Sequence, residues 1–231
     1  MSVNDIVDED LESEDAHPAA RLKSLVHQGA GRLSVLGAIL TIWIMDTVLS
    51  RHLVASGVVA SHVELLDALE WVGTAIFVLT SVTLMVAMTR RYDRLLIPAA
   101  AVYLAVAVLQ VVVNVISMLS TADTHHGGGL GTLWDVGAVY GMSVIVFMFV
   151  YIFLDLTTPG GAFVWPARDG KPAPTPNLFD YMFISMNVNS TYGPTNEAMM
   201  SRPGKLLMGL QVLLAVMMLT VLISRAVAAT N

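Results

Sequence analysis

The stretch LWDVGAVYGMSVIVFMFVYIFLD, residues 133–155, decides the fold. Between Asp135 and Asp155 it runs for nineteen residues without a charged side chain. The hydrocarbon core of a bilayer is about 30 Å thick, so a helix that crosses it needs about 20 apolar residues. Backbone groups in lipid must bond within their own segment, and the period-two alternation of a membrane strand is absent. The stretch therefore predicts a membrane-spanning helix.

Four further apolar runs have a similar length, and the composition agrees with them. Hydrophobic residues make up 55% of the 231 residues and charged residues only 13%, against about a quarter in soluble domains. The predicted fold is all-α, a polytopic bundle of about five spans in a lipid bilayer. The predicted spans are 33–50, 70–89, 95–120, 133–155 and 204–226.

The chain divides into three predicted parts: 1–32, 33–156 and 157–231. The first is a tail whose acidic composition favours a solvated, disordered segment, ending in a short interfacial stretch. A signal peptide would be basic there, so we expect no cleavage and a first span that acts as a signal anchor. The second part is a four-span bundle, and the third holds a linker, a short apolar segment and the last span. The acidic residues of the tail are Asp5, Asp8, Glu9, Asp10, Glu12, Glu14 and Asp15.

The distribution of basic residues predicts the orientation. With five spans, the tail, the turn at 90–94 and the connection 156–203 share one side of the membrane, which holds ten of the twelve basic residues. Cytoplasmic loops are enriched in Lys and Arg, so we expect a cytoplasmic N-terminus in the cell's inner membrane. The ten are Arg21, Lys23, Arg32, Arg90, Arg91, Arg94, Arg168, Lys171, Arg202 and Lys205; the other two are Arg51 and Arg225.

Residues 178–190 read LFDYMFISMNVNS and are apolar but too short to span. A segment of this length is typical of a re-entrant, interfacial or buried helix. The stretch Phe179–Ser185, then Asn189–Gly193, then Arg202 and the last span resembles the pore loop and inner helix of tetrameric cation channels. In potassium channels the filter reads Thr-Val-Gly-Tyr-Gly, and its carbonyls replace the water shell of the ion. Tyr192 and Gly193 match that filter.

The resemblance implies a filter, a monovalent cation and a homo-oligomer, because several chains build one pore. Thr191 stands where the first filter glycine would be. The implied filter residues are Asn189, Ser190, Thr191, Tyr192 and Gly193.

A second resemblance covers more of the chain. Trp134–Asp135 opens a span, Gly160–Phe163 follows it, and Phe179–Ser185 precedes the last span. This layout resembles an uncharacterised family of bacterial five-span membrane proteins, some of which have been compared to channels. The resemblance implies a fold and no activity.

The alternative interpretation of 178–193 is a short amphipathic helix packed on the bundle. Phe179, Met182, Phe183 and Met186 would then face the bundle. The chain would be a non-conducting membrane partner or assembly subunit.

Three polar residues fall inside predicted spans. Asp46 lies near the end of the first span, where it is either a proton or cation site or an interfacial carboxylate that reaches headgroup water. Gln110 and Asn114 lie four residues apart and share one helix face. We expect them to hydrogen-bond to a neighbouring helix, with a substrate contact as the other interpretation.

Catalytic and cofactor chemistry has little basis in this sequence. The chain has no cysteine, no phosphate-binding Walker loop and no His-Glu-x-x-His motif. Asp123, His125 and His126 lie on a glycine-rich loop, and adjacent histidines on such a loop are not preorganised for a metal. We therefore expect no enzyme activity and no cofactor, and no nucleic-acid partner because basic and aromatic stripes are missing.

Overall fold

Helices dominate the part of the chain that the structure, a computed structural model, describes. The described residues are 37, 40–45, 47–48, 71, 74–75, 78–83, 85–86, 93–120, 130–165, 176–190 and 197–228. Residues 40–45 and 78–83 are helical and fall within the first and second predicted spans. The rest of those two spans lies largely outside the described residues, so the count of five spans stays a prediction.

Three long helices are the frame of the molecule, and each contains a segment long and apolar enough to cross a membrane. They coincide with the predicted spans 95–120, 133–155 and 204–226, so the membrane-helical class is confirmed. The helices are α5 (Asp93–Ser120), α6 (Leu130–Thr157) and α8 (Arg202–Ala228), with candidate spans Ile97–Leu119, Trp134–Thr157 and Arg202–Ser224.

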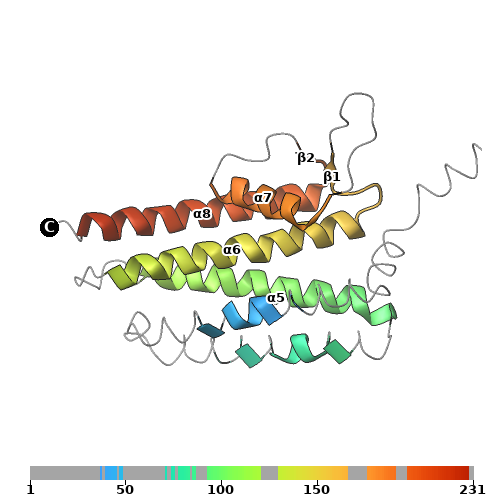
Figure 1. Cartoon of the computed structure of the whole chain (residues 1–231), viewed down its shortest axis with the longest axis horizontal. Helices are drawn as coiled ribbons and strands as arrows, with labels where there is room; N and C mark the ends of the chain where they lie inside the picture. The colour runs from blue at the N-terminus through green and yellow to red at the C-terminus, as the bar shows by residue number, and fades with distance from the viewer. Residues whose placement is uncertain are drawn as a thin grey trace, which may run out of the picture.

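The three long helices lie side by side along the longest axis of the molecule (Figure 1). α6 runs antiparallel to both α5 and α8, as the colours in Figure 1 show. The start of α5, the end of α6 and the start of α8 therefore lie at one end of the bundle. This is the end to which the sequence assigns most of the basic residues.

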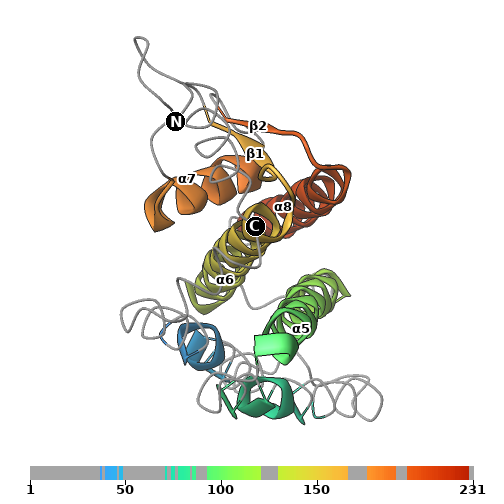
Figure 2. The ribbon, with the colours of Figure 1, turned by 90° about the vertical axis from the view of Figure 1, so that its right-hand side faces the viewer.

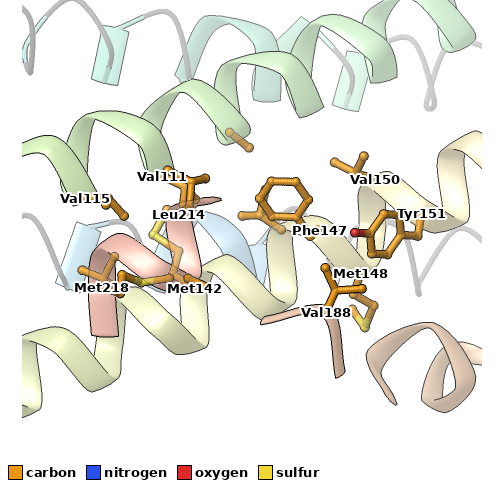
Figure 3. Packing of buried hydrophobic residues seen from close by; sticks show 14 of the residues in the cluster. Val111, Val115, Met142, Phe147, Met148, Val150, Tyr151, Val188, Leu214 and Met218 are labelled. Carbon is orange, nitrogen blue, oxygen red and sulfur yellow. The ribbon is translucent and has the colours of Figure 1, made fainter. Parts of the chain in front are cut away.

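The core fills the space between these three helices. Val111 and Val115 of α5, one turn apart, face Met142 of α6, and Leu214 and Met218 of α8 close the cluster (Figure 3). All five are buried. A spacing of three or four residues places such side chains on one face of each helix.

A short helix and a strand pair complete the described fold. The helix α7 (Leu178–Asn189) packs on α6 and α8, on the side away from α5 (Figure 2). The two-residue strands β1 (Phe163–Val164) and β2 (Ala198–Met199) pair antiparallel, with Phe163 opposite Met199. This pair ties the segment after α6 to the segment before α8, and the sequence did not predict it.

Candidate functional site

The helix α7 is the element that carries the predicted pore loop, and local capping defines where it begins. The side chain of Asn177 accepts hydrogen bonds from the backbone N–H groups of Phe179 (2.7 Å) and Asp180 (3.3 Å). The carboxylate of Asp180 in turn accepts from the backbone N–H of Asn177 at 2.7 Å. This reciprocal capping box satisfies donors that the first turn of a helix otherwise leaves free.

The end of α7 is also closed by local bonds. The backbone N–H of Ser190 donates to the carbonyl of Met186 at 2.9 Å, and the Ser190 hydroxyl donates to the carbonyl of Asn187 at 3.0 Å. The helix is therefore twelve residues long. At 1.5 Å per residue it measures about 18 Å, too short to cross a membrane.

The face that α7 presents to the bundle differs from the predicted one. Phe179 is 70% exposed, Phe183 49% and Met186 47%, while Met182 is half-buried. The expectation that these side chains face the bundle is therefore wrong for Phe179, Phe183 and Met186, whereas Met182 packs against the core. The buried residues of α7 are Tyr181, Ile184, Ser185, Val188 and Asn189.

The physical reason is that Ser185 and Asn189 hydrogen-bond to the neighbouring helices, which turns their face of α7 inward. The same face carries Tyr181, Ile184 and Val188, so Phe179, Phe183 and Met186 are left on the opposite face. Ser and Asn allow close approach and can bond across the interface.

A chain of buried hydrogen bonds fastens the middle of α7 to both neighbours. The Tyr151 hydroxyl donates to Gln211 Oε1 at 2.6 Å, which joins α6 to α8. Gln211 Nε2 donates to the carbonyl oxygen and the hydroxyl of Ser185, each at 3.0 Å. The Ser185 hydroxyl then donates to the carbonyl of Val144 at 2.8 Å. The helices α6, α7 and α8 therefore meet at these four residues.

The C-terminal end of α7 is held more weakly. The Ser143 hydroxyl donates to Asn189 Oδ1 at 3.3 Å, and both residues are buried. The side-chain nitrogens of Asn187 and Asn189 are also buried, and neither has a hydrogen-bond partner in the described part of the chain. Buried amide donors without partners are uncommon in folded proteins, so this end of α7 has unused hydrogen-bonding capacity.

These contacts place α7 beside one half of the span in α6. The Tyr181 hydroxyl donates to Asp155 Oδ2 at 2.6 Å, near the end of α6, while Asn189 contacts Ser143. Asp155 and Ser143 are twelve residues apart on α6, about 18 Å along its axis. The span Trp134–Thr157 has its middle close to Ser143. The chain then returns, because β2 pairs with β1 at the end where α7 began.

Asp155 joins α7 to the turn that follows α6. Its Oδ1 accepts hydrogen bonds from the backbone N–H groups of Ala162 (2.6 Å) and Phe163 (3.1 Å). Burial, and after it the hydrogen bond and charge of Asp155, raises the pKa of Tyr181 well above its usual range. The Tyr181 hydroxyl therefore stays protonated and donates to Asp155.

Aromatic rings surround this junction. The Tyr181 ring meets Trp165 edge-on at 5.5 Å between centroids and Phe163 at 6.1 Å. Phe163 also contacts Tyr151 edge-on at 5.7 Å. Such edge-to-face pairs add stability beyond the area that they bury. The same hydrogen-bonded and aromatic contacts bring together two segments named in the second resemblance, Gly160–Phe163 and Phe179–Ser185.

The structure describes only part of the predicted site. Asn189 is buried at the end of α7, and Ser190 is exposed. Thr191, Tyr192 and Gly193 lie outside the described residues, as does Asp46, so their roles stay predictions.

The two amides in α5 are distant in sequence from this site. Gln110 and Asn114 are both buried, and Asn114 Nδ2 lies 3.9 Å from the sulfur of Met142 on α6. Of the pair that opens the span in α6, Trp134 is exposed and Asp135 is buried.

Sequence reasoning missed the residues that hold α7 in place. Gln211 offered a signal, since an amide inside an apolar span usually has a partner on another helix. Asp155 and Tyr181 offered less, because both lie near predicted segment ends, where polar groups are common.

The comparisons add no relative to this description. No protein-family model, no curated protein and no solved structure matches the chain. The fold and the site therefore define the class by themselves: a helical integral membrane protein with a short helix packed beside its last two described spans.

Proposed function

We propose that the chain is a five-span protein of the bacterial inner membrane with a cytoplasmic N-terminus, and that α7 is a re-entrant half-helix. The antiparallel order of α5, α6 and α8 supports this topology, because it gathers the connections rich in Lys and Arg at one end (Figure 1). Arg202 and Lys205 are exposed at that end. The charge rule assigns such an end to the cytoplasm.

The function that fits this arrangement best is a cation-conducting pore built by several copies of the chain. One observation carries the proposal: α7 starts beside the end of α6 and finishes beside Ser143, near the middle of the span. The carbonyl end of a helix bears partial negative charge, so at this depth it favours a cation. The residues after it, Asn189–Gly193, are the proposed filter for a monovalent cation.

The order of elements supports the same proposal. α6 precedes α7, and α8 follows the proposed filter, which corresponds to the outer helix, pore helix and inner helix of the channels that the segment resembles. The polar residues Ser185 and Asn189 are bonded to α6 and α8 within one chain. A filter of this type is a ring of carbonyls from several chains, so the proposed filter needs other copies of the chain around the ion.

A second candidate function is a non-conducting membrane partner or assembly subunit. The exposed side of α7 favours it, because Phe179, Phe183 and Met186 present a wholly apolar surface. Such a surface suits lipid or an apolar helix of another protein, and it could not line an aqueous path.

Flux and thiol labelling together test the proposal. The full chain in vesicles of phosphatidylethanolamine and phosphatidylglycerol should carry K⁺ down a gradient. A cysteine at Ser190, in a protein with none of its own, should react with a membrane-impermeant thiol reagent and lose flux on modification. Val216→Cys is the matched control, because this residue is exposed on the protein surface at the middle of α8 but should face lipid and stay unreactive.

Two results would contradict the proposed pore. One is K⁺ flux no greater than in empty vesicles. The other is a Ser190→Cys protein that folds and stays unlabelled. Labelling of Ser190→Cys without flux would favour the partner function.

A further inference from the structure

The end of α6 carries an arrangement that the proposed function does not explain by itself. We propose that Asp155 is a positioning residue that anchors α7 to α6 and so sets the depth that α7 reaches. The importance of that depth rests on the proposed function, whereas the anchor is a property of the folded chain and can be tested separately.

Asp155 lies in an unfavourable place for a carboxylate unless it has partners. It is in the last turn of α6, which ends at Thr157, and the carbonyl end of a helix repels negative charge. Three donors offset this repulsion: the N–H groups of Ala162 and Phe163 and the hydroxyl of Tyr181. Hydrogen bonds to an ionised group are roughly twice as strong as neutral ones.

The turn after α6 is shaped to supply two of those donors. Gly160 and Gly161 have φ angles of +72° and +82°, which side chains other than glycine rarely adopt. A Cβ on Gly161 would lie 3.0 Å from Asp155 Oδ1. The turn therefore packs closely against the carboxylate. It then leads into β1, whose Phe163 contacts the ring of Tyr181.

The attachment of α7 weakens from its start to its end. Asp155 and the rings of Phe163 and Trp165 hold Tyr181, and Gln211 holds Ser185. Among the described residues, the last turn has a single side-chain bond to α6, of 3.3 Å to Ser143, and the amide nitrogens of Asn187 and Asn189 have no partner there. If the contact at Asp155 is lost, α7 is held in register with α6 by the bond of Ser185 to Val144 and by the longer bond of Asn189 to Ser143.

Thiol protection at Val188 measures this anchoring without reference to ion flux. Val188 is fully buried on α7, and Val111 is equally buried on α5, so Val188→Cys and Val111→Cys are a matched pair. Adding Asp155→Ala removes all three of its hydrogen bonds, of which the one from Tyr181 attaches α7 directly. The loss of that one charge-assisted bond should raise the labelling rate of Val188→Cys about tenfold or more. Val111→Cys should stay protected. Asp155→Asn keeps an acceptor for the turn and should restore most of the protection.

Tyr181→Phe removes only one hydroxyl and keeps the inference testable if Asp155→Ala does not fold. Trp165 then reports on the junction, in a protein whose other three tryptophans, all exposed, are changed to Phe: Trp43, Trp71 and Trp134. Tyr181→Phe should increase the labelling of Val188→Cys and shift the Trp165 emission, with a smaller effect than Asp155→Ala.

Unchanged labelling of Val188→Cys in both variants would overturn the anchor. Equal gains at Val188 and Val111 would overturn it too, because they would mean general loosening of the bundle. Wild-type vesicles that carry no K⁺ would instead contradict the proposed function and leave the anchor standing.

Discussion

Gln211 is the residue whose removal should destabilise the described bundle most clearly. It joins α8 to α6 through Tyr151 and to α7 through Ser185, with bonds of 2.6, 3.0 and 3.0 Å. Its side chain is fully buried, so no water replaces the lost partners. Leucine has a volume similar to that of glutamine, so Gln211→Leu removes all three bonds without leaving a large cavity.

The expected size of the effect follows from these contacts. Hydrogen bonds between membrane helices contribute about 0.6 kcal/mol each on average, so three amount to about 2 kcal/mol. The buried Tyr151 hydroxyl is then left without its partner, which costs about 1–3 kcal/mol. Apolar packing of the leucine recovers part of this loss. We expect Gln211→Leu to lower the free energy of unfolding by about 2–4 kcal/mol.

A double-mutant cycle separates the bond from general disturbance of the core. Tyr151→Phe alone should cost about 1–2 kcal/mol, because it leaves Gln211 Oε1 unpartnered. The loss of unfolding free energy in the double variant should be smaller than the summed losses of Gln211→Leu and Tyr151→Phe by about 0.5–1.7 kcal/mol. Denaturant unfolding in detergent, followed by circular dichroism, measures all three variants. Thr220→Val is the control on α8, since the Thr220 hydroxyl is exposed and, among the described residues, bonds to Val216 of its own helix.

A loss below about 0.5 kcal/mol for Gln211→Leu, the range of an ordinary surface substitution, would contradict the reasoning. Strict additivity in the cycle would also contradict it, since it would mean that Tyr151 and Gln211 do not interact.

Three further predictions concern the turn, the cap and the topology. Gly160→Ala should lower the free energy of unfolding by about 1–2 kcal/mol because of its positive φ alone. Gly161→Ala should lower it by about 1–3 kcal/mol more, because its Cβ crowds Asp155. Equal losses for the two variants in thermal unfolding would contradict the close contact. Asn177→Ala should lose about 1 kcal/mol through the missing cap, and Asn177→Ser should keep most of it; equal stability of the Ala variant and the wild type would exclude a role for the cap. A phosphatase fused after Asn231 should be active outside the cytoplasm, whereas a cytoplasmic reading would mean an even number of spans.

The long helices could be predicted because their signal is local. A run of about 20 apolar residues specifies a membrane helix whatever surrounds it. The observed α5, α6 and α8 accordingly match the predicted spans 95–120 and 133–155 and the last span, to within about one turn at each end. The start of α7 is equally local, since Asn177 and Asp180 form its capping box.

The arrangement around α7 could not be predicted because its contacts are not local. Ser185 and Gln211 are 26 residues apart, and Ser143 and Asn189 are 46 apart. A single sequence gives the polar residues of each helix and gives no means of pairing them. The prediction for Phe179, Phe183 and Met186 was wrong because both faces of α7 carry large apolar side chains, so apolar character alone does not say which face turns inward.

The orientation of α7 is itself an argument about its surroundings. Its inner face carries Ser185 and Asn189, bonded to neighbouring helices, between the larger Tyr181, Ile184 and Val188. Its outer face carries Phe179, Phe183 and Met186. In water, each large apolar side chain left exposed forgoes about 1.5–3 kcal/mol of burial. Rotating α7 by half a turn would bury these three side chains, but it would expose Tyr181, Ile184 and Val188 and break the hydrogen bonds of Ser185 and Asn189. The hydrogen bonds therefore fix which face of α7 turns inward, and the exposed Phe179, Phe183 and Met186 suit contact with lipid, as the proposed position of α7 requires.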